Sequence, residues 1–390
     1  MMDSLKSLFL LDPDVTFLNH GSFGACPLPV FEEYQRWQRE LESRPVEFLG
    51  RRATALLAEA RAALAAYLGA PADDVVYFPN PTTAVNMVAR SLRLQPGDEI
   101  LATDHEYGAM DRTWKVVCRK AGAKYVRRPI PLPVSSHAEF VEQFWAGVNQ
   151  RTRVIFLSHI TSPTALTFPV QEICRRARAA GLLTVVDGAH APGQLPLNLP
   201  QLGCDLYTGA CHKWLCAPKG SAFLYARPEV QSWLEPLVVG WGWSDAEEYA
   251  PNPEMGGTPF IRFHQWQGTR DLAAFLATPA AIAFQAAHDW EAVRRRCRVL
   301  AADTRHRLNA LTGLPAICPD SPEWFTQLFA ARLPDGADTK ALKTALYDDY
   351  RIEAPLIEWN GQKFIRVSFQ GYNTQADAEA LVEAMGNLLG

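Results

Sequence analysis

The chain has 390 residues, of which 48% are hydrophobic and 21% charged, and its formal net charge is −4. This apolar fraction excludes a wholly disordered chain, and the length predicts two or three domains. The near balance of 38 basic and 42 acidic residues, without a concentrated basic patch, argues against nucleic-acid binding. The sequence has neither a signal-peptide pattern nor an apolar stretch long enough to span a membrane, so we expect a cytoplasmic protein without membrane contact.

The eight cysteines are not expected to form a disulfide framework, because the chain is long and no pair has C-x-x-C spacing. Cys204, Cys211, His212 and Cys216 lie close together in the sequence, which raises a metal site as one hypothesis. Their spacing does not give the two paired ligand sets of a zinc site. We therefore expect no bound metal.

The predicted elements change in character along the chain. Residues 1–50 match neither later pattern and are expected to form an arm and a helix that complete a small domain. In residues 51–271, short apolar runs alternate with helical patterns, which indicates a large α/β domain with a mostly parallel sheet. Its expected strands are 75–78, 99–103, 124–127, 154–157, 182–186, 205–208 and 222–226, and its expected helices are 51–68, 82–92, 109–120, 137–148 and 170–180.

Residues 272–390 are predicted to form a smaller C-terminal α+β domain, because long helical patterns come first and isolated strands follow. The expected helices are 272–289, 291–311, 339–347 and 375–389, and the expected strands are 325–331, a short one near 351, and 364–369.

Polar residues follow several predicted strands, where ligands bind in open α/β sheets. Thr82 and Thr83 open a helix, an arrangement that suits a phosphate but also an ordinary helix start. Asp187 ends an apolar strand, where a carboxylate needs a partner or caps a helix. Lys213 has apolar and aromatic neighbours that would lower its pKa and make it nucleophilic, although most lysines are simply solvated. Together these three features are the parts of a pyridoxal phosphate site.

With these residues, the sequence resembles the class V aminotransferase group of fold-type I pyridoxal-phosphate enzymes, which includes cysteine desulfurases. Within that group it is similar to isopenicillin N epimerase-type proteins in four stretches, namely LNHGSFG (18–24), TDHEYGA (103–109), QGTRD (267–271) and IRVSFQGYNT (365–374). The resemblance covers nearly the whole chain. It implies a large cofactor domain and a smaller C-terminal domain, with pyridoxal 5'-phosphate as cofactor.

The resemblance also implies roles for individual residues. Lys213 matches the lysine that bonds to the cofactor, and His212 matches a neighbouring phosphate ligand. Asp187 matches the residue that pairs with the ring nitrogen. Further cofactor contacts are implied for Thr82, Thr83, Ser162 and His190, the last near the ring hydroxyl. Ala210 departs from the pattern, because relatives often have a phosphate-binding serine there.

An aromatic residue is implied to stack on the cofactor ring. Tyr107 is the first candidate and His105 the second. Thr269 resembles a threonine that reaches the phosphate of the neighbouring subunit, which implies a homodimer with shared active sites.

The substrate side of the site is implied to come from both ends of the chain. Arg366 matches an arginine that binds the substrate α-carboxylate by two hydrogen bonds. Asn19 and His20 are expected to line the substrate pocket, so a small amino-acid-type substrate is predicted. Trp241 and Trp243 are further candidates, although packing is the commoner role of such aromatic residues.

The expected catalytic residues are Lys213, Asp187 and Tyr107, and the activity favoured is that of an epimerase acting at an amino-acid α-carbon. A carbon–sulfur lyase and an aminotransferase are the alternatives, and a non-catalytic binding protein of the same fold is an alternative of another class. Residues 351–366 contain no cysteine, which argues against a persulfide-forming desulfurase but leaves direct C–S cleavage open.

Overall fold

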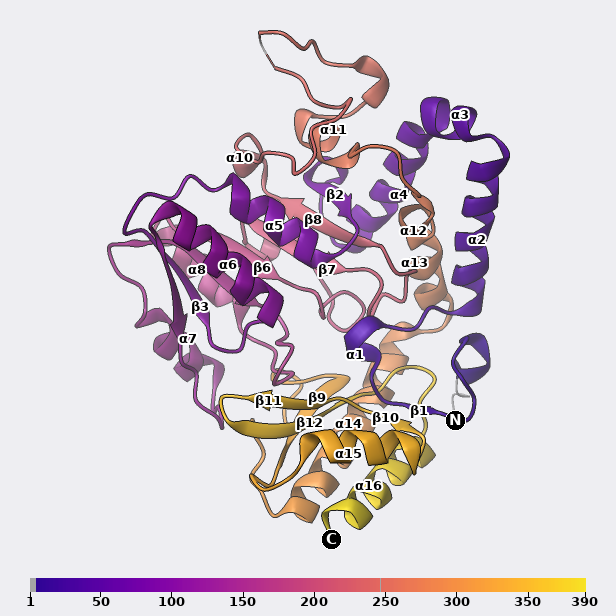
Figure 1. Cartoon of the computed structure of the whole chain (residues 1–390), viewed down its shortest axis with the longest axis vertical. Coiled ribbons are helices and arrows are strands. Elements are labelled where there is room, and N and C mark those ends of the chain that lie inside the picture. Colours follow the sequence, from indigo (N-terminus) through magenta and orange to yellow (C-terminus); the bar gives the residue numbers. More distant parts are fainter. Residues whose placement is uncertain (1–4, 246) are drawn as a thin grey trace.

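A seven-stranded sheet forms the centre of the larger part of the molecule, in the order β2-β8-β7-β6-β5-β3-β4. The structure is a computed structural model that describes residues 5–245 and 247–390 (Figure 1). The strands from β3 to β7 pair in parallel, whereas β8 runs antiparallel to both β7 and β2. The strands are β2 (Val75–Phe78), β3 (Glu99–Thr103), β4 (Lys124–Arg128), β5 (Thr152–Ser158), β6 (Leu183–Asp187), β7 (Leu206–Ala210) and β8 (Ala222–Ala226).

The central strands are apolar without alternation because both faces of the sheet are covered. In β5, Ile155 and Leu157 belong to one hydrophobic core, whereas Val154 and Phe156 belong to the core on the opposite face. Helices supply the covering layers on the two faces. They include α5 (Pro81–Ser91), α6 (Gly108–Ala121), α7 (His137–Trp145), α8 (Val170–Ala179), α9 (Leu199–Leu202), α10 (Pro228–Gln231) and α11 (Pro259–Gln265).

The smaller part of the molecule has a three-stranded antiparallel sheet in the order β11-β12-β9. Helix α14 packs on β9 and on α16, and α15 packs on β11. The elements are α14 (Trp290–Thr312), β9 (Leu328–Leu333), α15 (Thr339–Asp348), β10 (Ile352–Glu353), β11 (Leu356–Trp359), β12 (Gln362–Ser368) and α16 (Gln375–Leu389).

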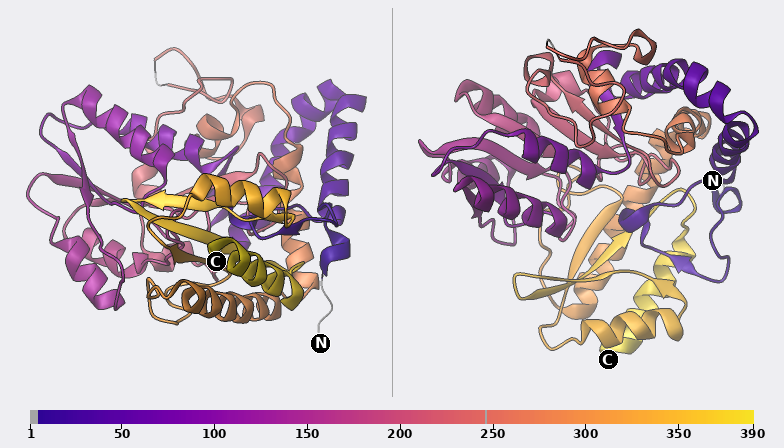
Figure 2. Two further views of the ribbon diagram at one scale, coloured as in Figure 1. Left: turned by 60° about the horizontal axis from the view of Figure 1, so that its bottom comes forward. Right: turned by 45° about the horizontal axis from the view of Figure 1, so that its top comes forward.

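The N-terminal region contacts both parts. Strand β1 pairs in parallel with β10 of the smaller part, and Ser368 N–H donates to Leu18 O at 2.9 Å. Helix α2 instead packs against α12 and α13, beside α4 (Figure 2). The elements are β1 (Thr16–Phe17), α1 (His20–Phe23), α2 (Leu28–Ser43), α3 (Pro45–Glu47), α4 (Ala53–Tyr67), α12 (Ala273–Leu276) and α13 (Thr278–Ala287), with a π-helical turn at Phe48–Arg52 and short 3-10 turns at Leu5–Leu8, Ala72–Asp74 and Pro253–Met255.

The predicted fold class is confirmed: an α/β sheet domain with a mostly parallel sheet is joined to a smaller antiparallel C-terminal sheet. Some local expectations differ from the structure. The single helix predicted at 272–289 is broken at Ala277, and Pro279 lies in the first turn of α13, where its missing N–H costs nothing. Strand β11 was not predicted, although Asn360 and Gly361 form the two-residue turn that follows it, with φ of 47° and 74°.

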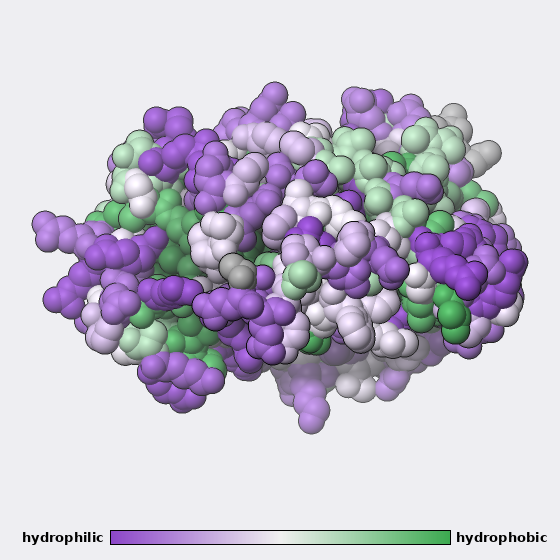
Figure 3. All heavy atoms as spheres, turned by 90° about the horizontal axis from the view of Figure 1, so that it is seen from above, coloured by the Kyte–Doolittle hydropathy of each residue, from purple (hydrophilic) through white to green (hydrophobic). Residues whose placement is uncertain are grey.

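The surface offers no membrane-spanning element in the described part of the chain, where no helix is both long and apolar enough to cross a bilayer. Seen from above, hydrophobic residues lie in separate patches among hydrophilic ones (Figure 3). Within residues 5–245 and 247–390, no three histidine, cysteine, aspartate or glutamate side chains form a group that could hold a metal ion.

Candidate active site

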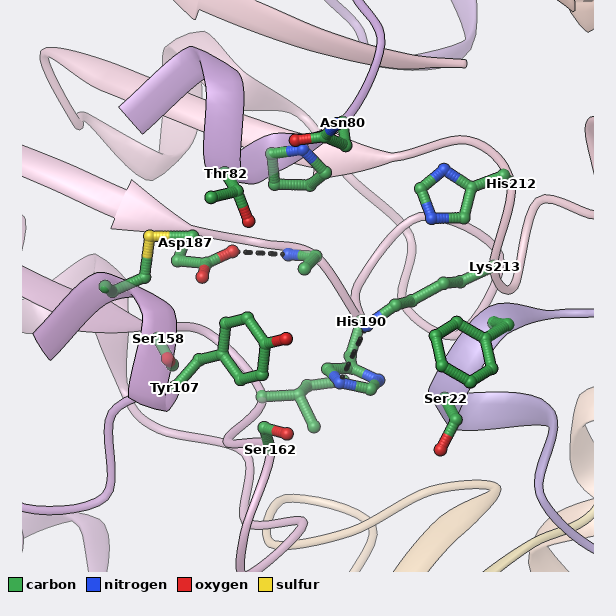
Figure 4. A pocket seen from close by; sticks show the side chains of 15 residues that line it. Ser22, Asn80, Thr82, Tyr107, Ser158, Ser162, Asp187, His190, His212 and Lys213 are labelled. Atoms are coloured by element: carbon green, nitrogen blue, oxygen red, sulfur yellow. Dashed lines mark hydrogen bonds between the residues drawn. The ribbon is translucent and has the colours of Figure 1, made fainter. Parts of the chain in front are cut away.

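A cavity of about 180 Å³ lies at the carboxyl ends of the central strands (Figure 4). Seven of the predicted site residues line it together, although they come from distant parts of the sequence. They are Thr82, Tyr107, Ser162, Asp187, His190, His212 and Lys213. The rule that ligands bind beyond the strand ends therefore leads to one cavity in this sheet.

The N-terminus of α5 forms one wall of the cavity. Asn80 caps the helix: its Oδ1 accepts hydrogen bonds from Thr83 N–H at 2.8 Å and Thr83 Oγ1 at 3.0 Å. The side chain of Thr82 faces the cavity, whereas Thr83 is used in the cap and does not line it. This helix terminus can bind an anion through its partial positive charge and the Thr82 hydroxyl.

Asp187, the last residue of β6, also lines the cavity, and it is 3% exposed. Its Oδ1 accepts from Ala189 N–H at 2.9 Å, and its other oxygen faces the cavity. Burial raises the pKa of this carboxyl, while the Ala189 N–H and Lys213 oppose the shift. A cationic N–H in the cavity would therefore be a favourable partner for the carboxylate.

Lys213 follows β7 and extends its amine into the cavity, where Nζ lies 3.3 Å from His190 Nε2. Burial and the nearby Arg366 guanidinium lower the pKa of Lys213 to about 8, which makes the neutral amine accessible near neutral pH. The adjacent His212 has Nδ1 3.0 Å from Ser221 O, so Nδ1 carries a proton and Nε2 is free for a ligand. Burial lowers the pKa of His212 to about 4, and a bound anion would raise it.

Arg366 on β12, in the smaller part of the molecule, does not itself line the cavity but binds two lining residues, Ser22 and Ser162. Its Nη1 donates to Ser162 O at 2.6 Å and Ser162 Oγ at 3.1 Å, and its Nη2 donates to Ser22 Oγ at 3.0 Å. Its Nε is buried and has no hydrogen-bond partner within the described residues. Burial lowers the pKa of this guanidinium to about 10. The unpaired buried donor suits an acceptor brought by a ligand.

Tyr107 lies at the N-cap position of α6 and lines the cavity with 47% of its surface exposed. The second stacking candidate, His105, is fully buried away from it. His105 Nδ1 lies 2.8 Å from Thr164 Oγ1, and Nε2 lies 2.8 Å from Ile130 O. Of the two residues, only Tyr107 is positioned to contact a ligand in the cavity.

Three other expected site residues do not line the cavity. His20 is fully buried behind it, with Nε2 3.0 Å from Lys213 O and Nδ1 3.0 Å from Tyr372 Oη. Asn19 donates to Glu353 Oε1 at 3.1 Å instead of facing a substrate. Thr269 is exposed outside the cavity. The arm instead contributes Ser22 and Phe23 to the lining. His20 and Asn19 therefore hold neighbouring segments in place.

Two further residues were not among the predicted site residues: Asn80, which lines the cavity, and Glu106, which binds the lining residue Ser158. Asn80 carried a usable signal, because asparagine followed by proline is typical of a helix start. Glu106, beside Tyr107, is 5% exposed and accepts hydrogen bonds from Ser158 N–H, Ser158 Oγ and Thr103 Oγ1 at 2.9, 2.7 and 2.6 Å. Burial raises the pKa of Glu106 to about 8, despite these hydrogen bonds. A buried carboxylate of this kind has no signature in the flanking sequence.

Comparison with known proteins agrees with this geometry. The family model described as "Aminotransferase class-V" matches residues 26–381. The chain belongs to this family of pyridoxal-phosphate-dependent enzymes. It is 42% identical over 385 residues to isopenicillin N epimerase from Amycolatopsis lactamdurans, covering 97% of this chain and 96% of the relative. It is 39% identical to isopenicillin N epimerase from Streptomyces clavuligerus, with 100% and 98% covered.

The fold is that of fold-type I pyridoxal-phosphate enzymes. A solved structure of a lysine mutant of C-DES, with glycine covalently linked to the PLP cofactor, superposes with a TM-score of 0.82. It is 22% identical, and the match covers 96% of this class-V chain and 97% of the other. At this identity, the similarity extends to the fold.

The residues of the cavity fit pyridoxal phosphate by their own chemistry. The capped α5 terminus and Thr82 suit its phosphate, and the free oxygen of Asp187 suits a protonated ring nitrogen. Lys213 carries an amine of lowered pKa at the cavity, which suits a bond to the aldehyde carbon of the cofactor. The orphaned Nε of Arg366 suits the carboxylate of an amino-acid substrate.

Proposed function

We propose that this class-V enzyme binds pyridoxal phosphate in the cavity and epimerises the α-carbon of an amino-acid-type substrate. The observation that carries the proposal is the placement of Lys213 and Tyr107, whose side chains extend into the cavity from opposite walls (Figure 4). Inversion at a carbon requires proton removal on one face and proton delivery on the other. Similarity to two isopenicillin N epimerases over nearly the whole chain supports the same activity.

The chemistry divides between the cofactor and the chain. When bound, pyridoxal phosphate withdraws electrons from the α-carbon of an attached amino group and so acidifies its C–H bond. Asp187 keeps the ring nitrogen protonated, and the neutral Lys213 amine removes the α-proton as general base. The Tyr107 hydroxyl delivers a proton to the opposite face. Arg366 holds the substrate carboxylate, so that the α-C–H bond points at Lys213.

The first test concerns the cofactor. Purified protein is expected to show a visible absorption band that borohydride reduction removes. The reduction should leave the cofactor covalently attached to the peptide that contains Lys213. Lys213→Ala should lack the band, whereas Lys219→Ala, altered at a nearby lysine that donates to Gly24 O, should keep it. A band that persists in Lys213→Ala would contradict the assignment.

The second test separates the activities. Isopenicillin N, named in the two relatives, and a set of amino acids are incubated with the enzyme in deuterated water. α-Deuterium with inversion supports the epimerase, whereas release of sulfide or pyruvate would identify a carbon–sulfur lyase, and oxo-acid formation an aminotransferase. Tyr107→Phe should retain α-deuterium exchange with retained configuration but lose inversion. Lys213→Ala should lose both.

The proposed assembly is a homodimer in which Thr269 reaches the partner's phosphate site. The segment before α11 projects from the top of the molecule in Figure 1 and exposes Val239 and Trp241 by 65% and 75%. A second copy would cover these exposed apolar side chains.

Light scattering tests this assembly, with Trp241→Glu expected to shift the protein towards monomer. Mixing Thr269→Ala with Lys213→Ala should give heterodimers that contain one intact site if the sites are shared. Recovery of activity with the separate variants inactive supports the arrangement, and a wild-type monomer contradicts it.

A further inference from the structure

A row of three side chains leads from the protein core to the Lys213 amine. The Trp214 indole Nε1 lies 3.2 Å from His190 Nδ1, and His190 Nε2 lies 3.3 Å from Lys213 Nζ. Trp214 is fully buried and His190 is 2% exposed, so water does not compete for the first contact. The order of these groups determines which atom carries each proton.

The direction of the hydrogen bonds follows from the capacity of each group. An indole N–H only donates, so His190 Nδ1 must accept from Trp214. A neutral imidazole has one donor and one acceptor, which leaves the proton on Nε2. Nε2 then donates to Lys213 Nζ, which accepts only as a neutral amine because an ammonium group has no free lone pair.

We propose that Trp214 is a positioning residue that holds His190 in the Nε2-protonated tautomer and thereby stabilises Lys213 as a neutral, nucleophilic amine. Both main chains are anchored, which fixes the two rings relative to each other. Gln194 Nε2 donates to His190 O at 2.7 Å, and Gln285 Nε2 donates to Trp214 O at 2.8 Å.

Burial and most of the charges around His190 and Lys213 lower the pKa of both side chains. Burial and Arg366 lower the pKa of Lys213 to about 8, and only Asp187 opposes this shift. Burial also holds the pKa of His190 well below its usual value. An imidazolium would donate from both nitrogens and leave no acceptor for Trp214, so the geometry and the low pKa agree. The groups whose charge lowers the pKa of His190 are Lys213, Arg366, His20 and His212.

The inference concerns protons on the chain's own residues, so it does not rest on the proposed epimerase activity. Its test uses the cofactor-free, full-length protein. Acetic anhydride is applied over a range of pH, and acetylation of the peptide containing Lys213 is measured by mass spectrometry. The midpoint of this profile reports the ionisation of the amine independently of any catalysed reaction.

Trp214→Phe removes the donor while keeping an aromatic ring. We expect the midpoint of its acetylation profile to rise by about one pH unit. Below the midpoint, this shift corresponds to about tenfold less free Lys213 amine. The cause is that His190 becomes free to take the other tautomer and accept from an ammonium group. Trp290→Phe is the matched control, because Trp290 Nε1 donates to the main-chain Gly193 O of the same loop, at 3.2 Å, and not to a histidine ring. Equal midpoints in the two variants would overturn the proposal.

A second measurement covers the case in which Trp214→Phe does not fold. Wild-type protein labelled with ¹⁵N-histidine is studied by NMR at neutral pH, and His190 is assigned by the signals lost in His190→Gln. The expected spectrum has a protonated Nε2 and an unprotonated Nδ1. The opposite tautomer, or a doubly protonated ring, would overturn the proposal.

Discussion

Trp359, at the end of β11 in the smaller part of the molecule, packs against His105 with ring centroids 4.2 Å apart. Its Nε1 also donates to Asp104 O at 2.8 Å, and Asn360 Nδ2 donates to Asp104 Oδ2 at 2.6 Å. Asp104 and His105 belong to the turn between β3 and α6 that leads to Tyr107. The β11–β12 hairpin therefore binds the loop that carries Tyr107 into the cavity.

This tie predicts a linked effect on stability and on substrate binding. Trp359→Phe keeps the aromatic contact but removes the N–H, so the free energy of unfolding should fall by about 1 kcal/mol. The KM for the amino substrate should rise at the same time. Urea unfolding and steady-state kinetics measure both. Trp145→Phe, on the partly exposed side of α7, is the control, and an unchanged KM in Trp359→Phe would contradict the link.

Arg366→Lys should weaken substrate binding more than catalysis. Lysine keeps the charge but lacks the planar guanidinium group, so it cannot bind Ser22, Ser162 and a carboxylate at the same time. The KM should rise by about ten- to a hundredfold, because one to two charge-assisted hydrogen bonds to the substrate are lost. Arg332→Lys, on the paired strand β9, should have no such effect. The amino-acid methyl ester tests the cause: its KM should change little, and an equal loss for acid and ester would refute carboxylate binding.

Glu106 should destabilise the protein as the pH rises. Burial raises its pKa from 4.5 to about 8, so the folded state binds this proton more tightly than the unfolded state does. Its contribution to stability is fully present below about pH 4.5 and is lost as the pH rises towards 8. The glutamine of Glu106→Gln cannot titrate. Thermal unfolding should therefore show that wild type loses stability relative to this variant between about pH 4.5 and pH 8. A constant difference across the range would contradict the prediction.

His20 should destabilise the protein as the pH falls. Burial lowers its pKa from 6.5 to about 3, with Lys213 and Lys219 contributing. Its contribution to stability is therefore present above pH 6.5 and lost as the pH falls towards 3. His20→Gln retains a donor for Lys213 O and an acceptor for Tyr372. Wild type should lose stability relative to it as the pH falls, and chemical unfolding at several pH values tests this.

Much of the fold was predictable because its signals are local. β2, β3 and β8 begin and end at the predicted residues, since apolar runs bounded by turn residues mark strands buried on both faces. The N-terminal strand β1 was missed: two residues that pair with β10 carry no periodicity. The turn at Asn360 and Gly361 was a usable signal for the β11–β12 hairpin.

The candidate site was predictable where position along a strand decides location. Thr82 and Lys213 follow β2 and β7, Asp187 ends β6, and the sheet brings all three to one edge. Side-chain direction was not predictable in the same way. His105 and Tyr107 are two residues apart, yet one is buried against Trp359 and the other lines the cavity. Tertiary contacts with the smaller part of the molecule decide that difference.

The pairing of β1 with β10 has a consequence for biosynthesis. Thr16 lies beside Ile352, and Ser22 contacts Arg366, so early and late parts of the sequence meet at the cavity. On a ribosome, the large sheet can begin to fold while the arm still has no strand to pair with. The pocket is therefore complete only after nearly all of the chain has been synthesised. Cofactor capture is expected to be one of the last steps in the maturation of this enzyme.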